Sequence, residues 1–151
     1  MKKFLGYIYK QKIMADLISK NPIPFEPKFE NRFIVTLPKK FGIDPYFVQS
    51  MNRPTYNLKK KSWENIKIEF VDPIGPSVSD KLFDLCQKKV KKFDIEVKTL
   101  DPTGVSIETW SIKDCKIVEI DFGNWKYYKI KEKDTIIIPA MTVNPKKCIL
   151  L

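Results

Sequence analysis

The sequence contains no histidine, only five glycines and only three cysteines, and each shortage excludes a class of chemistry. Without histidine, neither a Ser-His-Asp nor a Cys-His catalytic arrangement is available, and the usual zinc sites are excluded. The glycines stand singly at predicted turns, so none has the spacing of a phosphate-binding loop. The cysteines are odd in number and widely spaced, which argues against a disulfide framework and favours buried, reduced thiols. We therefore predict no catalytic, cofactor-binding or metal site and no enzymatic activity.

Carboxylates are the remaining acid and base candidates. On the predicted strands they occupy the solvent side, between apolar neighbours, so we interpret them as surface residues. They are Glu64, Glu69, Asp72, Asp114, Glu119 and Asp121.

Long apolar runs are missing too. No run approaches the roughly 18 residues of a membrane helix, and Lys10 and Lys12 interrupt the N-terminal apolar residues before a signal-peptide core forms. We expect a chain that stays in the cytoplasm in which it is made. At 151 residues it is the size of one domain with one core.

The charge is strongly positive, with a formal net charge of +10. Such an excess of lysine fits either a solvated surface or an anionic partner such as nucleic acid. The chain favours Lys over Arg and lacks exposed aromatics interleaved with glycines, so direct nucleic-acid binding is the weaker interpretation.

The N-terminal 30 residues differ from the rest of the chain. Apolar residues in 1–20 have loosely helical spacing, and Pro22, Pro24 and Pro27 predict a stiff, extended connector up to Asn31. We predict an arm over residues 1–30 and a β domain over residues 31–151.

Most of the β domain has the two-residue period of half-buried strands. Residues 32–37 and 46–51 are expected to pair as a hairpin, and residues 63–71 alternate Ile66, Ile68 and Phe70 with polar neighbours. Further strands are predicted over 95–99, 105–111, 110–122 and 135–143. The segment 110–122 shifts register around Ile117 and Val118, and Pro139 predicts a break, a bulge or an edge in the strand at 135–143. Three tryptophans at strand ends, Trp63, Trp110 and Trp125, are expected to plug the core rather than stack on a ligand.

One helix is predicted with a clear start. Ser77 and Asp80 form an N-cap with an acid in the first turn. Behind them an apolar stripe consists of Val78, Leu82, Phe83, Leu85, Cys86, Val90 and Phe93, with lysines covering the outer face.

The order of these pieces resembles the tail tube protein family of contractile-tailed bacteriophages, related to the tube proteins of type VI secretion systems. The resemblance covers roughly residues 31–145. It is carried by Asn31, Arg32, Phe33 and Val35; by Ser50, Arg53 and Pro54; by Trp63, Ile66, Ile68, Phe70 and Asp72; and by Trp110, Ile112, Cys115, Ile117, Ile120, Phe122 and Gly123, followed by Tyr127 and the strand at 135–143.

The resemblance implies a mainly β fold, an antiparallel sandwich or barrel with one flanking helix, and a structural role without cofactors. Copies would form hexameric rings stacked into a tube inside a contractile sheath, with sheath, baseplate and terminator proteins as further partners. DNA would pass through the lumen without specific binding, and the protein would reside in the virion tail. A tube initiator or terminator of the same fold, and a basic β-rich nucleic-acid-binding module, are the alternatives.

Two sets of residues follow as candidates for contacts. Residues of the lysine-rich loop are predicted to contact the next ring, with Arg53 as a candidate ion-pair former. They are Arg53, Pro54, Tyr56, Lys59, Lys60 and Lys61. The same stretch also fits a solvated hairpin loop. Contact with the sheath is predicted for the lysines of the helix, because a lumen that passes DNA should hold few cations. These are Lys81, Lys88, Lys89, Lys91 and Lys92.

Overall fold

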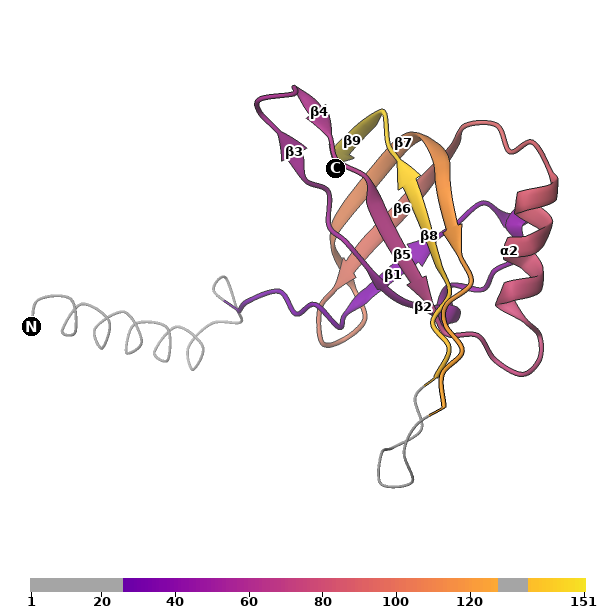
Figure 1. The fold of residues 1–151 in the computed structure, drawn as a ribbon. Coiled ribbons are helices and arrows are strands. Elements are labelled where there is room, and N and C mark those ends of the chain that lie inside the picture. Colours follow the sequence, from indigo (N-terminus) through magenta and orange to yellow (C-terminus); the bar gives the residue numbers. More distant parts are fainter. Residues whose placement is uncertain (1–25, 128–135) are drawn as a thin grey trace, which may run out of the picture. The chain divides into compact units, whose positions relative to one another are not determined.

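The computed structural model describes residues 26–127 and 136–151 (Figure 1). Contacts divide the chain into two units, residues 1–31 and residues 32–151. The predicted helical pattern in 1–20 and the start of the last predicted strand at Thr135 lie outside the described residues. That residues 1–30 act as an arm stays a prediction.

Antiparallel β-structure dominates residues 32–151, as predicted. Seven strands form one sheet. Six of them follow the order β1-β6-β7-β8-β5-β2, and the seventh, β9, pairs with β7. Their bounds are β1 Phe33–Thr36, β2 Val48–Met51, β5 Ile66–Phe70, β6 Phe93–Leu100, β7 Ser106–Asp121, β8 Ala140–Asn144 and β9 Lys147–Leu150. A separate two-stranded sheet is formed by β3 Tyr56–Asn57 and β4 Ser62–Trp63.

The long strand β7 connects the two halves of this sheet. Its first part pairs with β6 and β9, and its last part pairs with β8. The backbone of β7 bends at Asp114, which has a positive φ of 52°. Its partners β8 and β9 are separated near the same level by Pro145 and Lys146. A register shift between Ile117 and Glu119 confirms the shift predicted there. Because of this bend, the two halves of the sheet face each other across one core (Figure 1).

Alternating side chains from both halves fill that core. Val35, Ile95 and Ile112 come from one half, and Ile68 and Met141 come from the other. In β5 the predicted alternation of Ile66, Ile68 and Phe70 is confirmed, since all three are buried. Burying an aliphatic side chain of this size contributes about 1.5–3 kcal/mol, so these positions supply much of the driving force for folding.

Helix α2, Val78–Gln87, begins at the predicted cap. The Ser77 hydroxyl accepts a hydrogen bond from the Asp80 amide at 3.3 Å. Asp72 lies before the helix and accepts the amides of Val78 and Ser79 at 2.9 and 3.3 Å, together with the hydroxyls of Ser77 and Ser79. Burial alone would raise the pKa of Asp72, but these hydrogen bonds outweigh it, Ser79 foremost, and the pKa is lowered from 3.8. These capping bonds also explain why the helix starts here.

The predicted end of the helix is wrong. The helix stops at Gln87, Lys88 is already extended, and Val90 lies in the connection to β6. Phe93 belongs to β6, where its ring packs edge-on against Phe41 with centroids 4.8 Å apart. Pairing of β6 with β7 fixes Phe93 in an extended conformation, which overrides its helical spacing. The exposed side chains of Phe83 and Cys86 also contradict the predicted stripe.

The predicted hairpin of the first two strands is wrong as well. β1 pairs with β6 and β2 pairs with β5, at opposite ends of the strand order. Two short 3-10 helices, η1 Lys39–Phe41 and η2 Pro45–Phe47, carry the chain between them, with Gly42 in the left-handed conformation after η1. The apolar residues of β1 lie opposite residues of β6 in the ladder; Val35, for example, is paired with Val97.

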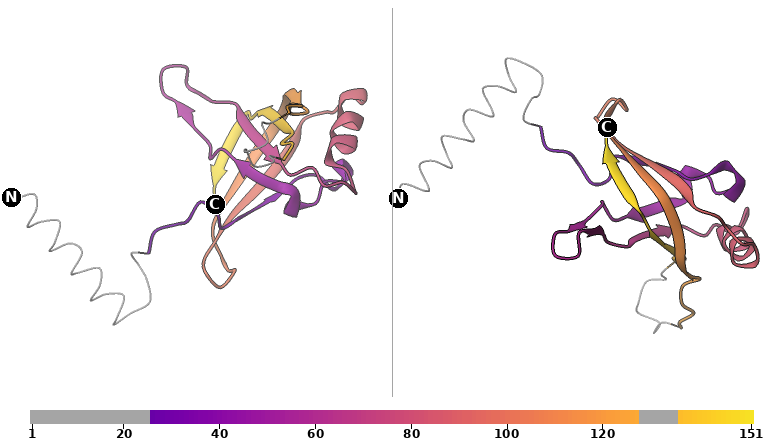
Figure 2. Two further views of the ribbon diagram at one scale, coloured as in Figure 1. Left: turned by 60° about the horizontal axis from the view of Figure 1, so that its bottom comes forward. Right: turned by 90° about the horizontal axis from the view of Figure 1, so that it is seen from above.

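Strand β9 and the exposure of Trp125 were not predicted. Trp63 and Trp110 pack against the core, as expected, whereas Trp125 is 96% exposed. Two further views show α2 and the β3–β4 hairpin at opposite ends of the β domain (Figure 2).

Candidate functional site

The residues predicted for inter-ring contact lie together in the β3–β4 hairpin and its stem. Tyr56 pairs with Trp63, and Asn57 pairs with Ser62. The Asn57 side-chain amide donates to Glu64 Oε1 at 2.8 Å, and its oxygen accepts the Lys60 amide at 3.0 Å. The tip is exposed at Leu58, Lys59, Lys60 and Lys61. This geometry brings a basic tip with one apolar residue away from the sheet; its contact with a second ring stays a prediction.

The stem of the hairpin holds an ion pair that sequence reasoning only half anticipated. The sequence predicts an ion pair of Arg53 with the next ring, but its Nη2 lies 2.5 Å from Oε1 of Glu108 in the same chain. Glu108 is 6% exposed, and the same oxygen accepts the Trp110 indole N–H at 2.7 Å. Glu108 was missed, although a signal exists. It shares the inward-facing alternation of Trp110 and Ile112, where a carboxylate requires a partner.

The lysines predicted to face the sheath do not share one helix. Only Lys81 lies in α2; Lys88, Lys89, Lys91 and Lys92 lie in the connection to β6, because the helix ends before them. All five are exposed. Lys39 and Lys40 of η1, which contacts α2, add to this basic end of the domain. Its contact with a sheath stays a prediction.

Open strand edges are the third surface. Within the part of the chain that the structure describes, β1 and β2 each have a strand neighbour on one side only. The Leu100 amide donates to the Arg32 carbonyl at 2.9 Å, so the alternate pairs of the ladder continue at Ile34 and Thr36. The backbone groups of Phe33 and Val35 consequently point away from β6.

Two apolar segments adjoin the sheet, one after β7 and one before β8. These segments, residues 122–127 and 136–139, expose Phe122, Trp125, Tyr127, Ile136 and Ile137. Gly123 has a φ of 89°, and a Cβ there would lie 3.0 Å from Cγ2 of Ile137. The segments 122–127 and 136–139 therefore approach each other closely at this glycine. Sequence reasoning placed a turn here but did not identify an exposed surface.

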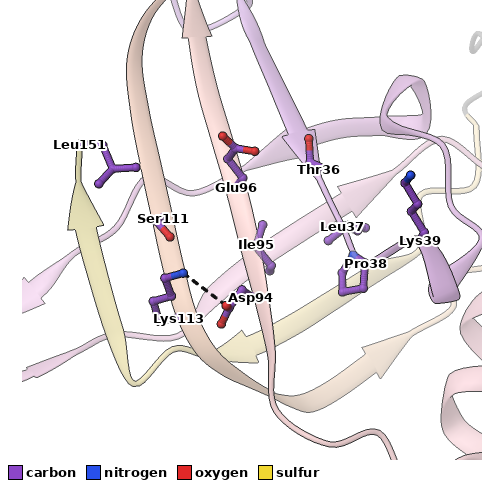
Figure 3. Close-up of a pocket in the computed structure, with 10 residues that line it drawn as sticks. All are labelled: Thr36, Leu37, Pro38, Lys39, Asp94, Ile95, Glu96, Ser111, Lys113 and Leu151. Carbon is purple, nitrogen blue, oxygen red and sulfur yellow. Dashed lines mark hydrogen bonds and ion pairs between the residues drawn. The ribbon is translucent and has the colours of Figure 1, made fainter.

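A hollow of about 450 Å³ lies on the outer face of β1, β6 and β7 (Figure 3). The Nζ of Lys113 lies 3.4 Å from Oδ2 of Asp94 within it. Thr36, Leu37, Pro38, Lys39, Ile95, Glu96, Ser111 and Leu151 complete the lining. The hollow holds paired surface charges, and its lining contains no cysteine or histidine to act as a nucleophile or base.

The two buried thiols, Cys115 and Cys148, are poorly suited to chemistry. Burial raises the pKa of Cys115 to about 12, with the charges of Cys148, Asp94 and Asp114 adding to it, and burial raises the pKa of Cys148 to about 11. Both thiols are therefore protonated at neutral pH. Cys86 is exposed, which contradicts the expectation that all three are buried. Among the described residues, no group of three His, Cys, Asp or Glu side chains could hold a metal, and no helix is long and apolar enough to span a membrane.

Comparison with known proteins identifies the fold. No family model and no curated protein matches the sequence. Among solved structures, a chain in the cryo-EM structure of the anti-feeding prophage (AFP) tube-terminating cap matches with a TM-score of 0.62 and 14% identity, covering 88% of this chain and 96% of that chain. The chain therefore has a tail tube-like fold.

Two further structures agree. A chain of the AFP baseplate matches with a TM-score of 0.57 and 10% identity, covering 83% of this chain and 96% of that one. A chain of the sheath-tube complex of the extracellular contractile injection system PVC matches with a TM-score of 0.55 and 17% identity. The match covers 91% of this chain and 96% of that chain. The predicted mainly β fold and the resemblance to tail tube proteins are confirmed at the level of the fold, and the matching assemblies are structural parts of contractile injection systems.

Proposed function

We propose that this protein is a non-enzymatic tube component of a contractile phage tail, in which copies form hexameric rings that stack around a channel for DNA. Sheath, baseplate and terminator proteins are its further partners. The fold supports this proposal, because chains of similar length in tube, cap and baseplate assemblies share it.

The open edges of the sheet carry the proposal. Solitary proteins protect such edges with charged residues or proline, since unpaired N–H and C=O groups recruit other strands. β1 consists of Phe33, Ile34, Val35 and Thr36, and β2 consists of Val48, Gln49, Ser50 and Met51. Neither strand contains a charge or a proline. Strands of such composition are suited to pairing with a neighbouring copy in a ring.

A role at the end of the tube is the second candidate. It is favoured by the AFP cap match and by a chain of the PVC sheath/tube terminator, which matches with a TM-score of 0.53 and 17% identity over 87% of this chain. A repeated subunit should form long tubes by itself, whereas an end protein should stop at single rings.

Negative-stain microscopy of the purified chain tests the proposal, with Gln49→Pro as the perturbation. Gln49 is the extra residue at the register shift between Val48 and Ser50, so it has no partner in β5. Proline is tolerated at bulges and on edges, and Val48 already has the extended conformation that a residue before proline requires, with φ −77° and ψ 114°. The variant should therefore fold but disturb the backbone of the edge strand β2, where a neighbouring copy would pair.

We expect rings or tubes from the parent protein and from Gln49→Ala, and neither from Gln49→Pro with an unchanged circular dichroism spectrum. Tubes formed equally by both variants would show that β2 pairs with no neighbour. A monomer that binds DNA in a salt-dependent manner and never forms rings would favour the nucleic-acid-binding alternative.

A further inference from the structure

Glu108 is a buried carboxylate at a position where the sheet elsewhere places apolar side chains. It lies on the inward face of β7 opposite Thr99, and its side chain is 4% exposed. Burying a charge is unfavourable unless hydrogen-bonded partners compensate, and an apolar residue of similar volume is often as stable or more stable. The position of the carboxylate therefore points to a role other than stabilisation of the core.

The partners of Glu108 come from two different parts of the chain. Arg53 stands in the segment between β2 and β3, and its side chain is 68% exposed although its Nη2 reaches the buried Oε1. Trp110 lies two residues along β7 and donates its indole N–H to the same oxygen. One carboxylate oxygen thus connects the stem of the hairpin with the sheet.

Aromatic contacts continue this connection into the hairpin. The rings of Trp63 and Trp110 meet edge-on with centroids 6.3 Å apart, and those of Tyr56 and Trp63 do so at 5.0 Å. The indole that Glu108 orients is therefore the ring on which the hairpin rests. A hairpin of two paired residues on each strand is not stable by itself, so its direction depends on this anchorage.

We propose that Glu108 is a positioning residue that fixes the direction of the β3–β4 hairpin through Arg53 and Trp110, and so presents its basic tip to the facing copy in the next ring. The hairpin's part in ring stacking rests on the proposed function. The anchorage itself does not, because it is a property of the single chain.

Amide hydrogen exchange of the full chain, read by mass spectrometry, tests the anchorage. The informative amide is that of Glu64, which donates to the Thr55 carbonyl at 2.9 Å and closes the hairpin. In Arg53→Ala and Glu108→Gln we expect exchange over residues 55–64 to accelerate by about tenfold or more, since each change removes the ion pair between Arg53 and Glu108. Exchange in β5, β6 and β8 should stay within about twofold of the parent.

Two controls separate positioning from simple loss of charge or of packing. Lys59→Ala removes an exposed charge from the same hairpin and should leave its exchange unchanged. Arg53→Lys keeps the charge and should restore at least part of the protection. Should Glu108→Gln fail to fold, Arg53→Ala decides the matter, because its side chain is mostly exposed.

The proposal is overturned if Arg53→Ala leaves hairpin exchange within about twofold of the parent, or if exchange rises equally over all strands, which indicates general destabilisation. Pelleting of assembled tubes from the same variants gives the second readout. A loosened hairpin with reduced stacking supports both parts of the proposal. A loosened hairpin in tubes that pellet normally leaves Glu108 as the positioning residue and refutes the hairpin's role between rings, with the tube function intact.

Discussion

Alkaline titration of Cys115 offers a quantitative test of the core. Its side chain is 0% exposed, and its pKa of about 12 lies well above the ordinary value of 9.0, with burial as the main cause. Below pH 9.0 the thiol is protonated in both the folded and the unfolded chain. As the pH rises above 9.0, only the unfolded chain releases this proton, so the free energy of unfolding falls until the pH reaches the folded pKa.

The size of the effect follows from these two pKa values. Each pH unit within the window removes about 1.4 kcal/mol, so raising the pH from roughly 8 to roughly 10.5 should remove about 2 kcal/mol through Cys115 alone. Cys148, whose pKa burial raises to about 11, also ionises at alkaline pH. The relevant quantity is therefore the difference between the parent and Cys115→Ala, in which the contributions of all other groups largely cancel.

Urea unfolding in the presence of a reductant, measured at a series of pH values, gives this difference. The alanine variant should be less stable at neutral pH, because it loses buried volume. This deficit should shrink by about 2 kcal/mol toward the alkaline end. A deficit that stays constant from neutral pH to roughly pH 10.5 would refute the burial of Cys115, since an accessible thiol ionises alike in both states.

Two further predictions concern the sheet and the helix. Ile68→Ala removes a side chain that is 0% exposed and should lower the free energy of unfolding, measured in urea, by about 2–5 kcal/mol. Its control, Lys67→Ala on the outer face, should change the free energy of unfolding by less than about 0.5 kcal/mol. Equal effects of the two variants would contradict the assignment of the two faces. Asp72→Ala removes the acceptor at the start of α2 and should cost about 1–2 kcal/mol at neutral pH. Because the pKa of Asp72 is lowered in the folded chain, its contribution to the free energy of unfolding is present above pH 3.8 and is lost as the pH falls through the folded pKa. The melting temperatures of the parent and Asp72→Ala should therefore converge in acid. A difference in melting temperature that stays constant with pH would refute the proposed role of the carboxylate.

Local patterns predicted the elements well. The alternation of Ile66, Ile68 and Phe70 indicates a strand with one buried face, and the structure confirms it. The cap at Ser77 marks the first turn of α2, and the register shift of β7 lies at the predicted residues. Each of these features depends on residues within a few positions of one another, so periodicity and capping chemistry suffice to identify them.

Pairings between distant residues were not predictable in the same way. The sequence offers residues 32–37 and 46–51 as neighbours in a hairpin, yet β1 pairs with β6, because Val35 and Val97 fill the same layer of the core. Helix α2 ends early because β6 requires Phe93. For the candidate surfaces, the sequence indicated the basic hairpin segment and Arg53, but it did not reveal that Glu108, 55 positions away, holds that arginine.

The amino-acid sequence by itself determined that this chain is a mainly β protein with a capped helix, a basic surface and no histidine-dependent chemistry, because composition, alternation and capping are local properties. Only the tertiary structure decided which strands are edges, where the lysines after Gln87 lie, and which carboxylate fastens the hairpin. These features depend on which surfaces meet when the sheet bends at Asp114, and the burial of apolar side chains that decides this involves segments far apart in the sequence.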